Sequence, residues 1–419
     1  MPAVRIRYSI VLLALCVNML CYTDRVAIAV AGPSIREEFG FSQSQMGLVF
    51  SVFSLSYALG QAPWGALADR HGARLIVAAA IVAWSGFTAL TGTARGFAAL
   101  IAIRLVFGAF EAALSPAVAS AFSRWIPVSE RSGAFGAYLG GGRLGGAVTP
   151  PIAAALMLGI GWRSMFAVFG AAGILAAAVW YAWYRDDPSR HPRTGAVELR
   201  EIEQGIPPRA VEKHGTDWGA ILASPRLWRL TGVAFCSTFL WQFFITWFPT
   251  YLKERRGMEL QEAAWFASLP FAFGVAATWV GGLAADVLTR RFGVRRGRTY
   301  LGCLSLSMAA ALMLAGILAP GPRAGAALMA LAAFAVDLYL GAAWASALDI
   351  GGRSGGAAAG LMNAASNAAG FASPALMGFV LDQWRDWNAV LLCGVATTIL
   401  GCVLWIGVNP REKQSLPDA

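Results

Sequence analysis

Long apolar runs recur along this chain, and each is long enough to cross a bilayer as a helix of about 20 residues. Hydrophobic residues make up 57% of the chain and charged residues only 13%, roughly half the charged share of a soluble domain. No soluble core could bury this much apolar sequence, so we predict an all-α membrane protein. Breaks at charged residues, Gly and Pro divide the runs into twelve spans: 8–31, 45–67, 74–93, 97–121, 133–157, 163–184, 227–251, 263–286, 299–318, 323–346, 354–381 and 388–408.

Two short patterns repeat at nearly the same offset, which predicts two pseudo-symmetric six-helix halves. Residues 65–69 (GALAD) follow the second span, and residues 282–286 (GLAAD) follow the eighth span 217 residues later. Ser132-Gly133 opens the fifth span, and Ser354-Gly355 opens the eleventh 222 residues later. We therefore expect substrate to bind between the halves near the membrane midplane. The predicted parts are a first half at 1–185, a cytoplasmic linker at 186–226, a second half at 227–410 and a cytoplasmic tail at 411–419.

The positive charge is distributed unevenly between the two sides of the predicted spans. Most of the 33 lysines and arginines fall in segments on one side, so the positive-inside rule places both termini in the cytoplasm. The net charge of +10 then mostly reflects topology and gives no argument for nucleic-acid binding. In the linker, residues 198–203 predict a short amphipathic helix on the cytoplasmic surface.

Four charged residues stand inside the apolar spans of the first half and are the main functional candidates. Asp24 and Arg25 lie in the first span, where each charge costs roughly 2.5–3.5 kcal/mol and needs a cavity and a partner. Arg104 and Glu111, seven residues apart in the fourth span, share one helical face. Such a set satisfies the rule that buried charges are paired. It could also couple transport to protons, because a protonated acid releases its arginine to a substrate carboxylate; a static network that holds the helices is the alternative.

A second charge group lies at the cytoplasmic edge, in residues 65–74. Asp69 and Arg70 lie there between two glycines. Arg131, near the start of the fifth span, is a candidate partner for Asp69. Such a pair would latch one conformation. Ordinary positive-inside charge explains Arg70 but leaves Asp69 unexplained.

The second half offers weaker candidates. Trp344 lies near the end of the tenth span, and Asn363 and Asn367 lie one turn apart in the eleventh. Amides in a bilayer need partners, so they would bind substrate hydroxyls or the neighbouring helix. Asp337 is a further membrane acid that the sequence alone does not place.

Cofactor and enzyme chemistry find no support in the sequence. The three histidines lie in loops without metal-ligand spacing, and no phosphate-binding glycine loop precedes a Lys-Ser or Lys-Thr pair. We expect no metal, no cofactor and no ATP drive, which leaves an ion gradient as the energy source.

These motifs resemble the major facilitator superfamily along the whole chain, and within it the anion:cation symporter family of bacterial galactonate, glucarate and hexuronate porters. The superfamily features are residues 65–74 between the second and third spans and residues 104–108 in the fourth. The closer resemblance covers residues 21–25, 57–63, 110–112, 125–131, 161–163, 246–252 and 360–363.

The resemblance implies twelve helices, an inner-membrane location and proton-driven uptake of an organic anion. It assigns protonation to the acids at Asp24 and Glu111, and it assigns the substrate carboxylate to Arg25 and Arg104. Residues that match the lining of the family's sugar-acid site are Tyr57, Trp344 and Asn363.

The chain departs from galactonate-type porters at two positions. Gly142 stands where those porters carry a glutamine, with Arg143 next to it, and Phe243 stands where they tend to carry a tyrosine. The lost amide and hydroxyl and the added cation favour a smaller, more acidic or aromatic anion.

We therefore predict a monomeric proton-coupled symporter for an organic carboxylate, with a sugar acid as the leading class. It would work by alternating access, with membrane lipid as a further partner and no nucleic acid. A major-facilitator efflux antiporter for a small amphiphile or drug is the alternative, although the membrane arginines argue against a cationic cargo. A membrane sensor would need a larger soluble output domain.

Overall fold

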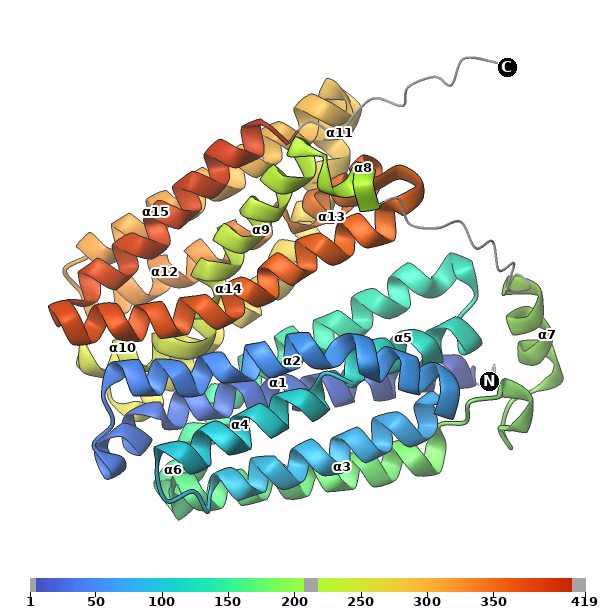
Figure 1. The fold of residues 1–419 in the computed structure, drawn as a ribbon, viewed down its shortest axis with the longest axis horizontal. Helices are drawn as coiled ribbons and strands as arrows, with labels where there is room; N and C mark the ends of the chain where they lie inside the picture. Colours follow the sequence, from blue (N-terminus) through green and yellow to red (C-terminus); the bar gives the residue numbers. More distant parts are fainter. Residues whose placement is uncertain (1–4, 207–217, 409–419) are drawn as a thin grey trace. The chain divides into compact units, whose positions relative to one another are not determined.

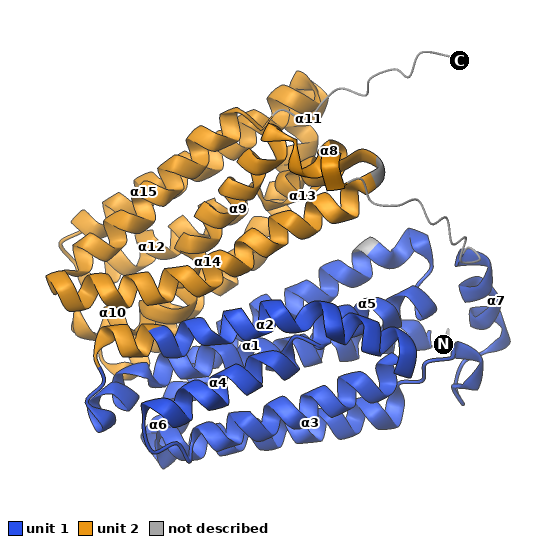
Figure 2. Ribbon diagram, in the orientation of Figure 1, with its two compact units in different colours: residues 1–41, 48–213 blue, residues 42–47, 214–419 orange. Residues whose placement is uncertain are grey.

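The computed structural model describes residues 5–206 and 218–408, and this part of the chain is helical and contains no β-strand (Figure 1). Residues 207–217 of the predicted linker and the predicted tail 411–419 lie outside the described residues. The chain divides into two compact units, which are residues 1–41 with 48–213, and residues 42–47 with 214–419 (Figure 2). They are called unit 1 and unit 2 below.

Unit 1 contains the helices of the predicted first half and one helix of the predicted linker. In chain order these are α1 (Ile6–Phe39), α2 (Gln43–His71, whose first residues belong to unit 2), α3 (Ala73–Thr91), α4 (Phe97–Glu111), α5 (Leu114–Trp125), α6 (Arg131–Trp183) and α7 (Ala196–Gly205).

Unit 2 contains the remaining helices, and one of its spans includes a π-helical turn (Phe243–Trp247) between two α-helices. In chain order the helices are α8 (Trp218–Leu222), α9 (Pro225–Gln242), α10 (Phe248–Glu254), α11 (Leu260–Leu318), α12 (Pro322–Asp337), α13 (Leu340–Gly351), α14 (Gly355–Trp384) and α15 (Trp387–Ile406).

The helices account for twelve membrane crossings, as the sequence predicts. In the described residues, nine helical stretches are long and apolar enough to span a membrane. Two of these, α6 with 53 residues and α11 with 59 residues, are each divided by one non-helical glycine and so supply two crossings. The 29-residue α2 supplies the twelfth.

The breaks in α6 and α11 depend on the conformational freedom of glycine. Gly161 has φ 79° and ψ 160°, and Gly293 has φ 79° and ψ 162°. A side chain would strain the backbone at such a positive φ, whereas glycine adopts it readily. The sequence therefore allows the chain to turn at these two points between successive spans.

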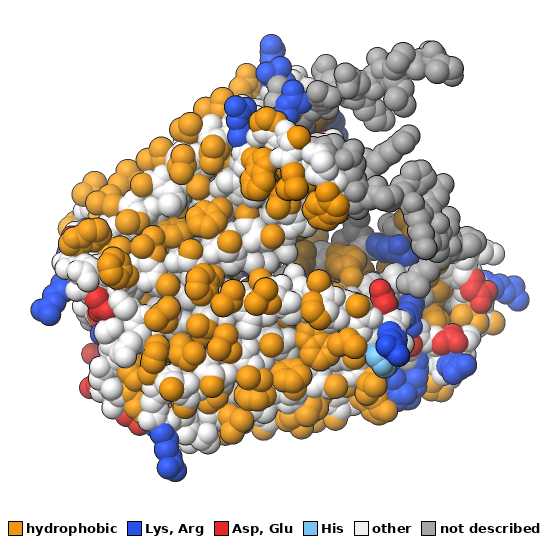
Figure 3. All heavy atoms as spheres, in the orientation of Figure 1, with side chains coloured by type: hydrophobic (Ala, Val, Ile, Leu, Met, Phe, Trp, Pro, Cys, Tyr) orange, Lys and Arg blue, Asp and Glu red, His pale blue; other side chains and the backbone are white. Residues whose placement is uncertain are grey.

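Apolar side chains cover the flanks of both units, as a lipid-facing surface requires. Figure 3 shows hydrophobic side chains across the visible flank of each unit, with charged side chains gathered near the helix ends. Leu59, Trp279 and Leu318 are 71%, 75% and 80% exposed. In water such a surface would mark an interaction site, and here it fits the apolar core of a bilayer.

Small residues let α1 and α6 pack closely. A Cβ added at Gly141 would lie 2.3 Å from the carbonyl oxygen of Leu15, and one at Gly145 would lie 2.2 Å from that of Met19. No side chain fits at these distances, so glycine is required for the two backbones to approach.

The linker helix predicted at residues 198–203 is confirmed as α7. Its side chains cap the N-terminus of α1. Glu198 accepts hydrogen bonds from the backbone N–H groups of Ile6 and Arg7 at 3.0 and 2.8 Å. The buried Arg7 side chain pairs with Glu201 and Glu130 at 2.9 and 2.8 Å. A carboxylate at a helix N-terminus satisfies otherwise unpaired N–H groups, so the linker fixes where the first span begins.

Candidate functional site

A buried ion pair between α1 and α4 forms the centre of the candidate site. Arg25 contacts Oε1 of Glu111 with Nε at 2.6 Å and with a terminal guanidinium nitrogen at 2.5 Å. Glu111 is fully buried, and the Arg25 side chain keeps 17% of its exposure. Both bonds end on Oε1, and Oε2 of Glu111 is buried without a nitrogen or oxygen partner. The Cys21 thiol interacts with the same carboxylate.

Aromatic rings surround the Arg25 guanidinium. Its central carbon lies 5.1 Å from the ring centre of Tyr22, 4.9 Å from that of Phe53 and 4.6 Å from that of Tyr57. These are cation–π distances, and the rings hold the planar group in one orientation. Tyr57, predicted as a substrate-lining residue, thus lies directly against the predicted anion-binding arginine.

Asp24 and Arg104 complete the cluster of four charges. The buried Asp24 carboxyl faces Trp84 and Thr88 of α3, and it interacts electrostatically with Glu111 and Arg104. The structure thus brings the four predicted residues together, and it shows that Glu111 is the acid that binds Arg25 directly.

The guanidinium of Arg104 has fewer direct polar partners than that of Arg25. It lies 4.9 Å from the ring centre of Phe53 and 4.7 Å from that of Phe107. Its Nε is buried without a hydrogen-bond partner, and no described carboxylate forms an ion pair with it. A buried unsatisfied N–H is costly, so this group is suited to receive an anionic ligand.

The predicted fourth span changes its hydrogen bonding beside the cluster but stays one helical stretch. α4 ends at Glu111 and α5 starts at Leu114, yet Ala112 and Ala113 keep right-handed helical backbone angles, and Phe97–Trp125 form one span. The corresponding span of unit 2 does the same after the buried Asp337, with α13 starting at Leu340. In each unit the local turn therefore follows a membrane-embedded acid directly, which the sequence pattern did not reveal.

Gly142 belongs to the site through its contact with α1. A Cβ added there would lie 2.6 Å from the ring of Tyr22 and 3.0 Å from the side-chain nitrogen of Asn18. A side chain at this position would displace Tyr22 from Arg25. Glycine at position 142 is therefore a packing requirement of this aromatic cage.

Replacing Gly142 with alanine should weaken binding of the transported anion about three- to tenfold, because a displaced ring forfeits a cation–π contact of about 1 kcal/mol. Isothermal titration of the purified protein with the anion that it transports would measure this. Gly140→Ala is the matched control, since a Cβ there meets nothing within 4 Å. Equal dissociation constants for the two variants would contradict the role given to Tyr22.

Asp69 and Arg131 have separate partners in this structure. Asp69 accepts a hydrogen bond from the Ser120 hydroxyl at 3.1 Å, whereas Arg131 donates to the carbonyls of Ile126 and Ser123 at 3.1 and 3.0 Å. The Arg131 guanidinium is thus engaged with the end of α5. Arg70 is exposed, and the latch role of these residues stays a prediction.

Asp186 is the acid at this end of unit 1 that sequence reasoning missed. Its carboxylate accepts hydrogen bonds from the backbone N–H groups of Ala73 and Arg74 at 2.7 and 3.3 Å, and it lies 3.6 Å from Arg124. It therefore caps α3 from a position more than a hundred residues away in the chain.

Trp344 and Asn363 lie in unit 2, on α13 and α14. Trp344 is 42% exposed, and Asn363 is partly buried. The backbone carbonyl of Asn363 accepts a hydrogen bond from the Asn367 side chain at 3.1 Å. The two asparagines thus lie on one helical face, as predicted, and their substrate roles remain untested.

Comparison with known proteins agrees with this architecture. Residues 14–354 match the family described as Major Facilitator Superfamily. A probable sulfoacetate transporter of Cupriavidus necator is 33% identical over 422 residues, which cover 99% of this chain and 96% of that protein. A probable galactarate/D-glucarate transporter of Bacillus subtilis is 30% identical over 99% of this chain and 95% of that protein.

The fold also matches a crystal structure. A bacterial homologue of the human lysosomal transporter Spinster, in an inward-facing and unoccupied conformation, aligns with a TM-score of 0.75 at 22% identity and covers 96% of this chain and 95% of that one. The fold class and the resemblance predicted from sequence are therefore confirmed. This chain belongs to the Major Facilitator Superfamily and is a multi-pass membrane transporter, not an enzyme.

Proposed function

We propose that this protein takes up an organic anion together with protons, and that the anion is a sugar acid or a related small carboxylate or sulfonate. The relatives described above are named for sulfoacetate and for galactarate and D-glucarate, which all carry acidic groups. Two arginines in the membrane interior suit such a cargo, because a guanidinium binds a carboxylate or sulfonate with paired hydrogen bonds.

The observation that carries the proposal is the pairing of Arg25 with only one oxygen of the fully buried Glu111. The other oxygen is not bonded to Arg25, so a proton could add to it while the Arg25 contact is still in place. Protonation would remove the charge that attracts Arg25, and the guanidinium would then be available to the substrate. A proton and an anion would therefore bind together, which is the requirement for symport.

Asp24 and Arg104 would support this exchange. Asp24 is a second buried acid in the electrostatic range of Glu111, and two such carboxylates disfavour each other's ionised form. Arg104 offers an unsatisfied N–H to the same anion. Trp344 and Asn363 of unit 2 remain our candidates for additional substrate contacts during alternating access.

We place the transporter in the inner membrane as a monomer with both termini in the cytoplasm. The positive-inside rule supports this orientation. Efflux of a lipophilic cation gains no support from the site, because the charge closest to the aromatic cage is itself a cation.

Uptake into proteoliposomes tests the proposal. With acid outside, labelled sulfoacetate or D-glucarate should accumulate above its external concentration, and a protonophore should abolish the accumulation. A dye trapped inside should report acidification when the anion is added. Accumulation that ignores the proton gradient would contradict symport, and extrusion of lipophilic cations without anion uptake would favour the efflux alternative.

A further inference from the structure

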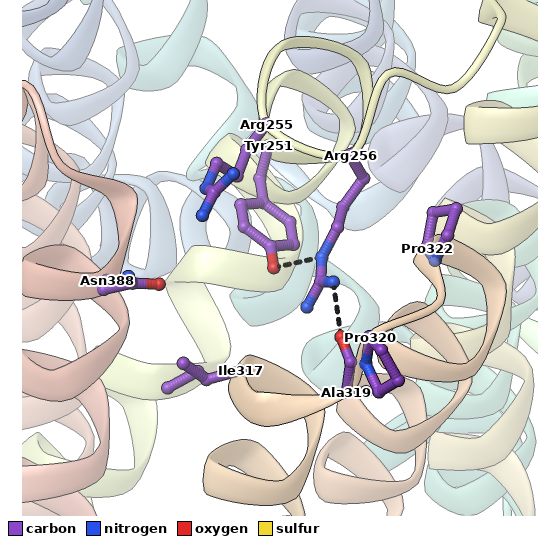
Figure 4. A pocket seen from close by; sticks show the side chains of 8 residues that line it. All are labelled: Tyr251, Arg255, Arg256, Ile317, Ala319, Pro320, Pro322 and Asn388. Atoms are coloured by element: carbon purple, nitrogen blue, oxygen red, sulfur yellow. Dashed lines mark hydrogen bonds between the residues drawn. The ribbon is translucent and has the colours of Figure 1, made fainter.

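A cavity of about 280 Å³ opens at one end of unit 2, away from the linker. It lies where α10 and α11 end and where α12 and α15 begin. In the proposed orientation this end faces the outside of the cell, because α9 enters the membrane from the cytoplasmic linker. The residues that line it are Tyr251, Arg255, Arg256, Ile317, Ala319, Pro320, Pro322 and Asn388 (Figure 4).

Two adjacent arginines give this cavity a positive charge. Arg256 donates to the Tyr251 hydroxyl at 2.7 Å, to the Ala319 carbonyl at 3.0 Å and to the Gly316 carbonyl at 2.5 Å, all of which are neutral. Arg255 is exposed and makes no side-chain hydrogen bond or ion pair with any described residue. No carboxylate of the described chain therefore balances either guanidinium directly.

Hydrogen-bond donors converge on the same space. The buried Tyr251 hydroxyl accepts from Arg256, so its own hydrogen remains available to donate. Figure 4 shows this hydroxyl and the side-chain oxygen of Asn388 pointing into the cavity, with Arg255 and Arg256 on either side of the Tyr251 ring. Phenol and guanidinium donors around one space match the acceptor oxygens of an anion.

The backbone adds to the positive character. Both α12 and α15 begin at the cavity, with Pro322 and Asn388 in their first turns. The N-cap residue of α12, Gly321, provides no side-chain cap. At α15 the N-cap Asp386 already supplies an anion, because its carboxylate accepts a hydrogen bond from the Asn388 backbone N–H at 2.9 Å. Helix N-termini favour anions, so the start of α12, without a side-chain cap, selects the same sign of charge as the two arginines.

We propose that this cavity is an anion-binding site that holds a small carboxylate or sulfonate at the outer end of unit 2. Its volume of about 280 Å³ lies just below the usual range of ligand pockets, about 300 to 1,000 Å³, so it fits a compact anion. The identity of the ligand rests on the proposed function, since the site would capture the transported anion from outside.

Arginine labelling with phenylglyoxal tests the site in the full-length purified protein. Saturating sulfoacetate or D-glucarate should slow modification of Arg255 at least fivefold, measured by peptide mass spectrometry. Neutral D-glucitol should have no effect. Arg323 is the internal control, because its side chain is 78% exposed at the start of α12 and pairs with Glu262 outside the cavity lining.

Two variants make the result specific. Asn388→Asp places a negative charge in the cavity without touching Arg255, and it should abolish the protection; Asp is well tolerated in a first helical turn. A variant with Arg25→Ala and Glu111→Gln removes the buried pair of unit 1 and should keep the protection. The proposal is overturned if neither anion protects Arg255, if Asn388→Asp remains protected, or if the unit 1 variant loses protection.

The proteoliposome assay separates this inference from the proposed function. Proton-driven uptake without protection of Arg255 would remove the outer site and leave symport intact. Protection without proton-driven uptake would keep the site and overturn symport.

Discussion

Glu111→Gln should abolish proton-driven accumulation of the anion while leaving exchange of anion across the membrane nearly unchanged. Glutamine keeps the size of the side chain and mimics the protonated acid, so Arg25 would be permanently available to the substrate. With a gradient of one pH unit, symport of one proton per anion supports about tenfold accumulation, since 1.4 kcal/mol corresponds to a factor of ten. The variant should show no accumulation in the same proteoliposomes, yet it should exchange labelled for unlabelled anion.

The matched control is Glu38→Gln. Glu38 also pairs with an arginine of unit 1, with 2.5 Å between its Oε1 and a guanidinium nitrogen of Arg163, but it is exposed at the end of α1. This variant should accumulate anion like the parent. Loss of both accumulation and exchange in Glu111→Gln would indicate a structural role for the Glu111 pair. Retained accumulation would assign the proton to another acid, and Asp24→Asn would then be the next variant to measure.

Much of the fold and part of the site follow from the sequence for clear physical reasons. Long apolar runs identify the spans, because only the apolar core of a bilayer accommodates them. Asp24 and Arg25 stand out because a charge in a bilayer is expensive, and the spacing of Arg104 and Glu111 puts both on one helical face. These inferences need only composition and helical geometry.

The specific partners could not be predicted, because they depend on how the helices are rotated and shifted against each other. Spacing does not tell whether Asp24 or Glu111 binds Arg25. Asp186 reaches the start of α3 from the far end of unit 1, and no local pattern indicates such a contact.

Arg25→Ala should raise the dissociation constant of the transported anion at least thirtyfold and eliminate uptake. Truncating one member of a buried hydrogen-bonded charge pair costs about 2–5 kcal/mol, and the anion would lose that partner. Arg25→Lys should not restore binding. A lysine offers a point charge instead of a planar fork, and it loses the stacking on Tyr22 and Tyr57 that orients the guanidinium.

The single variant also leaves Glu111 buried without its partner, which destabilises a fold by about 3–5 kcal/mol. A loss of binding could then reflect a loss of structure. The double variant Arg25→Ala with Glu111→Gln removes the uncompensated charge, so its thermal unfolding temperature should recover towards that of the parent. Its anion affinity should not recover, because the missing guanidinium is the group that binds the carboxylate.

The pair at the end of α1 provides a stringent control for this argument. Arg163 binds Glu38 and lies 5.5 and 4.4 Å from the ring centres of Phe39 and Trp162, so it repeats the ion pair and the aromatic contacts of Arg25 outside the charge cluster. Arg163→Ala should keep the parent's anion affinity, measured by thermal shift and titration. If Arg25→Ala kept that affinity as well, the substrate carboxylate would have to bind elsewhere, with Arg104 as the remaining buried guanidinium of the cluster. Arg25 would be identified as the anion's partner only if two results hold. Anion affinity must be lost in Arg25→Ala but not in Arg163→Ala, and the loss must persist in the stabilised double variant.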